Sequence, residues 1–107
     1  MICVLATMEV AAGRRDELLA LLEPLVPKVR AEAGCIDYTP MVDVRSGLPA
    51  QSPVRDNALT ILEKWESLDA LHAHLKTVHM AEYFQKAEDL RVSLTLQVVE
   101  PAGPRKA

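Results

Sequence analysis

The order in which the hydrophobic periodicity changes along the chain constrains the fold most. Four segments have apolar residues at every second position, the pattern of β-strands: 2–10, 35–44, 58–66 and 92–100. Two regions, 14–33 and 68–90, instead repeat apolar residues three and four positions apart, as amphipathic helices do. The resulting order β-α-β-β-α-β predicts an α+β, ferredoxin-like fold, an antiparallel sheet with helices on one face.

The first helical region contains two prolines and is followed by a glycine. Pro24 and Pro27 each remove a backbone donor and press on the carbonyl four residues earlier. Because the apolar stripe keeps its phase across both, we expect one helix with a kink near Glu23 rather than two helices. Gly34 tolerates the left-handed conformation that commonly follows a last helical turn, so we expect the helix to end there.

The second helical region carries two capping signals. The hydroxyls of Ser67 and Thr77 can each accept a hydrogen bond from a free amide in the following turn. We therefore expect two short helices. The apolar stripe predicted for the first of them consists of Leu68, Leu71 and Leu75.

The predicted second strand contains a proline and is followed by a long segment of turn-forming residues. Pro40 has no ladder donor, which indicates an edge position or a bulge. Residues 45–57 are rich in turn formers without periodicity, and we expect a loop that is mobile or closes over a partner chain. One face of the strand is predicted to carry Ile36, Tyr38, Val42 and Val44.

Composition limits the class of protein. With 107 residues, 50% hydrophobic and 25% charged, the chain can form one packed domain, which we place at 1–101 with a flexible tail at 102–107. The net charge is −3 and the basic residues are scattered among acids, which argues against nucleic-acid and anionic-membrane partners.

The N-terminus and the cysteines bear on localisation. The chain begins directly with an alternating apolar segment and lacks the pattern of a secretory signal, and no apolar run reaches the roughly 20 residues of a membrane-spanning helix. We interpret Cys3 and Cys35 as buried packing residues in a reducing compartment. A cytoplasmic protein without membrane insertion is therefore expected.

The fourth strand predicts an oligomer. It offers Leu94, Leu96 and Val98 on one side and Val99 on the other, whereas helices cover only one face of such a sheet. A second copy of the sheet would remove the bare face from water at roughly 25 cal/mol per Å². We expect a two-fold symmetric homodimer.

Three motifs occur in a specific order and spacing. Glu32 precedes Gly-Cys-x-x-Tyr at 34–38, Glu-x-Trp-Glu-Ser follows at 63–67, and Thr-x-His-Met at 77–80. Together they resemble the bacterial quinol monooxygenase branch of the antibiotic biosynthesis monooxygenase family, over about residues 1–101. The resemblance implies a dimeric α/β barrel without metal or organic cofactor, which oxidises a hydroquinone or related polycyclic phenol with dioxygen in a cavity between sheet and helices.

The implied chemistry suits so small a chain. A hydroquinone that has lost a proton is electron-rich enough to reduce dioxygen itself, so the protein must only desolvate it, orient it and take the proton. Apolar walls and one or two convergent polar groups would suffice. A rival from another class is a non-catalytic dimeric barrel that binds or senses small aromatic molecules, because a fold does not fix its chemistry.

Candidate catalytic residues lie near the second and third motifs. His79 falls in the first turn after Thr77, where the helix dipole disfavours a protonated imidazole, and is the leading candidate base. The alternative for His79 is a surface histidine that makes a capping contact. Glu63 and His74 are the reserve bases. Glu63 is expected on the same face as Trp65, so it either has a partner there or has a raised pKa.

The candidate substrate-binding residues are apolar or amphipathic, so each could equally be a core residue. The resemblance places Trp65 in the ligand cavity, with Tyr38, Met80 and Tyr83 as further walls. No metal site is expected, because His72 and His74 point about 200° apart on a regular helix. Haem-degrading relatives use an asparagine and a histidine where this chain has Ala6-Thr7 and Tyr83-Phe84, which argues against haem.

Overall fold

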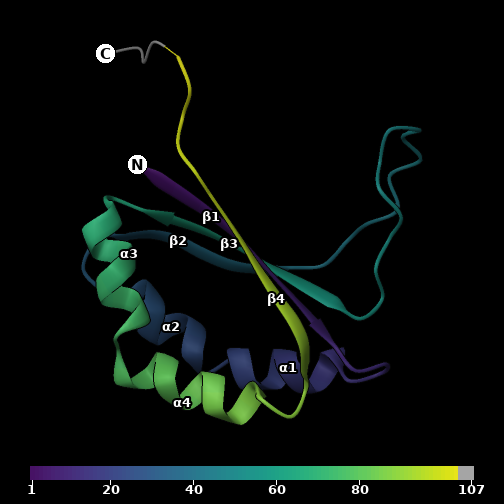
Figure 1. Ribbon diagram of the computed structural model, residues 1–107, viewed down its shortest axis with the longest axis horizontal. Helices are drawn as coiled ribbons and strands as arrows, with labels where there is room; N and C mark the ends of the chain where they lie inside the picture. The colour runs from purple at the N-terminus through teal and green to yellow at the C-terminus, as the bar shows by residue number, and fades with distance from the viewer. Residues whose placement is uncertain (104–107) are drawn as a thin grey trace.

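The computed structural model describes residues 1–103. Its elements are β1 Ile2–Val10, α1 Arg15–Leu22, α2 Leu25–Arg30, β2 Cys35–Met41, β3 Ala58–Trp65, α3 Leu68–Leu75, α4 Val78–Ala87 and β4 Arg91–Val99. The strands form one antiparallel sheet in the order β2-β3-β1-β4, and the helices gather on one side of it (Figure 1). The α+β ferredoxin-like prediction is confirmed. Most of the predicted tail, 104–107, lies outside the described residues.

The core lies between the helices and one face of the sheet. Alternate residues of β1 and β3 supply the sheet side, because successive side chains of a strand point to opposite faces. Leucines and a valine of α1 and α2 pack onto them, and burial of each such side chain contributes about 1.5 to 3 kcal/mol. The buried residues of these four elements include Val4, Ala6, Met8, Leu59, Ile61, Leu18, Leu22, Leu25 and Val29.

The predicted kinked first helix is two helices, so that expectation is wrong. The interruption falls at Glu23 and Pro24, where the kink was expected, and both keep helical backbone angles. Pro24 and Pro27 cannot donate to the carbonyls of Ala20 and Glu23, so the hydrogen-bond ladder is broken twice within one turn. α2 also ends at Arg30, before the predicted end near residue 33.

Strand β2 differs from its prediction because of a bulge. It ends at Met41, and its register with β3 shifts between Cys35 and Asp37. The extra residue turns Ile36 outward, 52% exposed, while Tyr38 is buried on the helix side. Val42 and Val44 are exposed beyond the strand, so the predicted common apolar face is wrong. β2 lies at the sheet edge, as Pro40 indicated.

Both predicted caps are present. The Ser67 side chain accepts from the Ala70 amide, and the Thr77 side chain accepts from the Met80 amide. The three leucines of the predicted α3 stripe line one groove on the sheet side of the helix, but only Leu71 is buried, while Leu68 and Leu75 are exposed. His74 occupies the second buried position of that helix.

Strand β4 and the long loop lie outside the helix layer. Leu94, Leu96 and Val98 face the helix side of the sheet but stay 36 to 50% exposed, because no helix covers this edge. Residues 42–57 form a loop that projects away from the sheet and helices (Figure 1). Within residues 1–103, no helix is both long and apolar enough to cross a membrane.

Candidate active site

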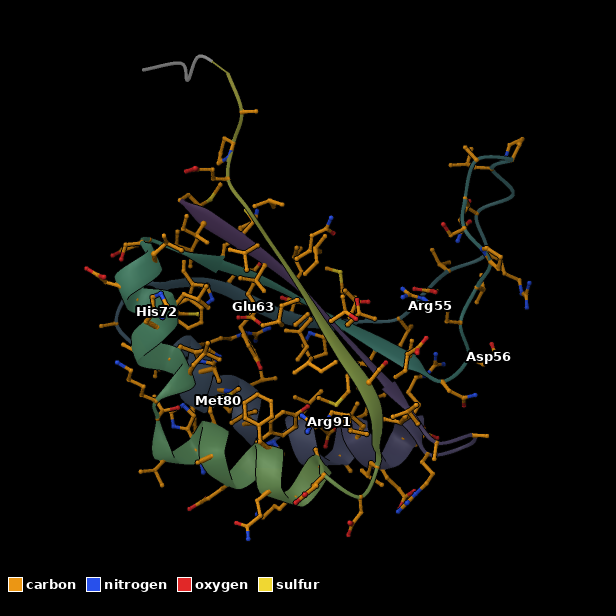
Figure 2. All side chains as sticks on the ribbon, in the orientation of Figure 1. Arg55, Asp56, Glu63, His72, Met80 and Arg91 are labelled. Atoms are coloured by element: carbon orange, nitrogen blue, oxygen red, sulfur yellow. The ribbon has the colours of Figure 1, made fainter. Side chains whose placement is uncertain are left out.

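A cavity lies on the helix side of the sheet, between the strands and helices α3 and α4. Figure 2 shows Glu63 and Met80 in this space, whereas Arg55 and Asp56 lie toward the long loop. The walls are mostly apolar, with a carboxyl, an imidazole and two tyrosines among them. The lining residues are Ala6, Met8, Tyr38, Ile61, Glu63, His74, Leu75, Met80, Tyr83, Phe84, Leu94 and Leu96.

His74 is the most buried polar side chain of the cavity, at 1% exposed. Its Nδ1 lies 3.0 Å from Oε2 of Glu32. A carboxyl oxygen that carries no proton only accepts, so Nδ1–H donates and Nε2 keeps its lone pair. Nε2 is buried without a hydrogen-bond partner in the described chain, and lies 4.0 Å from Oε1 of Glu63. Burial lowers the pKa of His74, partly opposed by the hydrogen bond to Glu32, so the ring presents a neutral, basic nitrogen.

Aromatic rings hold this imidazole in place. The Trp65 ring centroid lies 4.6 Å from that of His74, and the Tyr38 ring meets the imidazole edge-on at 5.7 Å. Contacts of this kind restrict the ring to one orientation. The lone pair of Nε2 is therefore fixed in direction.

Glu63 lies beside His74 in the same cavity. Its position on the helix side follows from the register of β3, where Glu63 pairs with Val4 and Tyr38. The Trp65 indole Nε1–H donates to Oε1 of Glu63 at 3.0 Å. Burial raises the pKa of this carboxyl to about 7, against the opposing effect of the indole hydrogen bond. A partner and a raised pKa were the two alternatives expected for Glu63, and the carboxyl has both.

Glu32 reaches His74 because the turn before β2 packs closely on α3. Gly34 has φ +82°, and its carbonyl accepts from the Glu66 amide at 2.8 Å. A Cβ on Gly34 would lie only 2.6 Å from Cβ of Ala70, which is one helical turn from His74. Only glycine combines this backbone conformation with so close an approach.

Both tyrosines of the cavity are held as neutral donors. Burial raises the pKa of Tyr83 to about 12 and raises the pKa of Tyr38 further. The Tyr83 hydroxyl donates to Sδ of Met8 at 3.7 Å. Neither phenol can act as a base near neutral pH.

The sequence-predicted site residues fall into three groups. Glu63, His74, Tyr38, Met80 and Tyr83 line one cavity.

Trp65 is fully buried behind that cavity, where it supports Glu63 and His74. His79 does not line it, because its Nε2 lies 2.7 Å from Oε2 of Glu32 and its ring borders a separate groove beside α1 and α2. From the sequence, Glu32 stood out only as the residue that precedes the first motif, and no role was predicted for it. That motif was its sole signal in the sequence.

The histidines are arranged for hydrogen bonding. His74 and His79 both direct a ring nitrogen at the same Glu32 oxygen. No group of three or more His, Cys, Asp and Glu side chains suited to hold a metal ion occurs between residues 1 and 103.

Comparison with known proteins places the chain in a family. The family model described as "Antibiotic biosynthesis monooxygenase" matches residues 1–86. The chain belongs to the antibiotic biosynthesis monooxygenase family. It is 33% identical to "Probable quinol monooxygenase YgiN" of Escherichia coli K12 over 103 residues, covering 94% of this chain and 98% of that protein.

Solved structures agree with this family fold. Rv0793 of Mycobacterium tuberculosis superposes with a TM-score of 0.79 at 23% identity, covering 98% of each chain. PA3566 of Pseudomonas aeruginosa gives 0.78 at 24% identity, covering 95% of this chain and 94% of that one. At this level of identity the likeness establishes the fold of this antibiotic biosynthesis monooxygenase family member.

Proposed function

We propose that this protein is a cofactor-independent monooxygenase that oxidises a hydroquinone or related polycyclic phenol with dioxygen. One observation carries the proposal. His74 is buried and held by Glu32, and it directs an unpartnered basic nitrogen into an apolar cavity. Family membership and the similarity to YgiN, which is named as a probable quinol monooxygenase, support a monooxygenase.

The proposed reaction begins with a proton. Nε2 of His74 takes the proton of a substrate hydroxyl, and the resulting anion, desolvated by the apolar walls, transfers electrons to dioxygen. One oxygen atom becomes bonded to a ring carbon and the other leaves as water. A hydroquinone and dioxygen thus give a hydroxyquinone and water, and dioxygen takes up all the electrons that the substrate loses.

Glu63 has a complementary role in the proposal. With a pKa of about 7, this carboxyl is partly protonated at neutral pH, 4.0 Å from the imidazole that acts as the base. Such a pair of a neutral base and a carboxylic acid suits a reaction that removes a proton at one oxygen and returns one at another. Glu63 is also the second candidate base.

Oxygen uptake tests the proposal directly. Reduced naphthoquinones, benzoquinols and anthrones would be offered to the purified protein, with a chelator present and with spontaneous oxidation subtracted. Saturable uptake that persists in the chelator is the expected result, with one hydroxyquinone from a quinol, or one quinone from an anthrone, formed per dioxygen consumed. Saturable binding without uptake would instead support the non-catalytic sensor.

Substitution of His74 tests the proposed base. His74→Gln should lower kcat by about 100- to 10,000-fold, the usual contribution of a positioned base, with a smaller effect on substrate binding. His72→Gln is the matched control, because His72 lies on the same helix but is exposed and outside the network. Wild-type turnover in a folded His74→Gln variant would exclude this histidine and leave Glu63 as the next base to test.

The proposal also includes the assembly. We propose a cytoplasmic homodimer in which the helix-free faces of two sheets meet. The mixture of threonines and apolar side chains on that face supports the dimer. The half-buried free thiols of Cys3 and Cys35 support the cytoplasm.

A further inference from the structure

One carboxylate oxygen connects the buried histidine of the cavity to a histidine at the surface. Oε2 of Glu32 lies 3.0 Å from Nδ1 of His74 and 2.7 Å from Nε2 of His79. Both contacts have hydrogen-bond length, and they converge on the same atom. The rings come from different helices, α3 and α4, and the carboxylate from the turn before β2.

Exposure increases along this chain of three groups. The side chain of His74 is 1% exposed, that of Glu32 11%, and that of His79 23%. His74 lines the apolar cavity, whereas His79 borders the separate groove beside α1 and α2. The three side chains therefore span from the candidate active site to the groove that α4 forms with α1 and α2.

We propose that Glu32 and His79 form a proton relay that joins His74 to solvent. The inference rests on the proposed function in one respect, because the proton that enters the relay at His74 comes from the substrate. Glu32 and His79 contact no substrate and serve as relay residues behind the base.

Each step forms one bond to hydrogen and breaks another. The relay starts with one proton shared between Oε2 of Glu32 and Nε2 of His79, and with His79 protonated at Nδ1. As the substrate proton bonds to Nε2 of His74, the Nδ1 proton passes to Oε1 of Glu32, 3.2 Å away, and the shared proton moves onto Nε2 of His79. His79 then loses its Nδ1 proton to water. When the second oxygen leaves as water, the same path in reverse brings a proton inward, and His74 regains its Nδ1–H form.

The surroundings favour transfer through this path. On the cavity side, the imidazole of His74, 1% exposed, stands between the Glu32 carboxyl and the mostly apolar cavity walls. On the outer side, lysines and a glutamate border the groove that His79 faces. The charged and titratable groups of neighbouring elements are Cys35 and Tyr38 of β2, Glu63 of β3, Lys28 of α2, and Glu82, Tyr83 and Lys86 of α4.

A purely structural role for His79 makes a different prediction. If His79 only oriented Glu32, any side chain that donates to Oε2 would replace it. Glutamine retains an N–H donor at similar reach but cannot accept a proton at one atom while releasing another. His79→Gln therefore separates relay from support, and His79→Asn is the second variant if glutamine impairs folding.

The first measurement needs no substrate. The exchange rate of the His74 Nδ1 proton with water would be followed by NMR on protein labelled with ¹⁵N-histidine, in the wild type, His79→Gln and the exposed control His72→Gln. The relay predicts exchange slower by about an order of magnitude or more in His79→Gln, unchanged exchange in the control, and partial recovery on adding imidazole. Unchanged exchange in a folded His79→Gln variant would overturn the relay.

The second measurement uses turnover. In His79→Gln, kcat with a reduced naphthoquinone should fall while KM stays near wild type, and rising imidazole concentration should restore kcat. Insensitivity of the variant to imidazole would contradict the relay. If the wild type consumes no oxygen with any quinol while proton exchange behaves as predicted, the proposed function fails and the relay stands, so the two failures are distinguishable.

Discussion

His74 and Glu63 are both buried, and burial favours the uncharged form of each. The pKa of the histidine is lowered and that of the carboxyl is raised to about 7, so a free base and a carboxylic acid lie 4.0 Å apart. Either group alone would be a costly buried polar residue. Together they give an apolar cavity the means to remove one proton and to supply another.

The raised pKa of Glu63 makes a prediction about stability and pH. A carboxyl whose folded pKa exceeds its ordinary value of 4.5 favours the folded state fully below that value, and this contribution is lost as pH rises through about 7. The loss amounts to at most about 3.5 kcal/mol at about 1.4 kcal/mol per pKa unit. Glu63→Gln should therefore become more stable relative to wild type between pH 5 and pH 8.

Urea unfolding at both pH values measures this difference. The other carboxylates and His74 are present in both proteins, so their contributions to the pH dependence of the unfolding free energy cancel when the variant is compared with the wild type. Parallel changes in the free energy of unfolding of the two proteins would show that Glu63 does not titrate in this range.

Periodicity and motif predicted most residues of the proposed site, whereas sequence separation hid the contact that Glu32 makes. Glu63 was placed on the helix side by alternation in β3, and the register confirms that face. The contact of Glu32 with His74 joins residues 42 positions apart and depends on how a turn packs against a helix. No local pattern carries that information, so the glutamate that orients the base received no role.

At the scale of elements, the turn between α2 and β2 determines the geometry of the site. It places Glu32 within reach of both histidines, and the positive φ of Gly34 lets it approach α3. The geometry of the proposed site thus depends on Gly34, a residue that has no side chain to contribute to the site.

Gly34→Ala should therefore cost both stability and activity. A left-handed alanine costs about 1 to 3 kcal/mol, and the added Cβ would also clash with Ala70, moving the turn and Glu32 away from His74. Gly13→Ala is the matched control, since Gly13 has φ +80° but open space around its Cβ. Thermal unfolding and kcat of both variants measure the effect, and equal losses in the two would refute a role for the close approach.

The interruption between α1 and α2 and the bulge in β2 show why details of these elements could not be predicted from the sequence. The interruption at Pro24 was located correctly, but whether a helix bends or divides depends on the loss of consecutive ladder bonds rather than on the phase of an apolar stripe. The bulge at Ile36 arises from pairing with β3, because two residues of β2 oppose one of its neighbour. Alternation in β2 alone therefore assigned Ile36 to the wrong face.

At the scale of the whole molecule, the sheet has one face covered by helices and one without helices. The helix-free face includes Leu5 at its centre, opposite Leu62 of β3 and Gln97 of β4. Threonines of the same three strands lie beside them, and Thr7 and Thr60 are 3.2 Å apart through their hydroxyls. A surface of small, flat and partly apolar side chains can pack against a copy of itself about a two-fold axis.

The proposed homodimer makes the last prediction. Burial of about 800 Å² per partner is typical of a stable interface, and a charge at its centre leaves a desolvated ion without a partner. Leu5→Lys should therefore convert a wild-type dimer into a folded monomer in light scattering and sedimentation at micromolar concentration. Val78→Lys, 74% exposed at the start of α4, is the control and should remain dimeric. A wild-type protein that is monomeric at that concentration, or a Leu5→Lys variant that stays dimeric, would show that this face is not the interface.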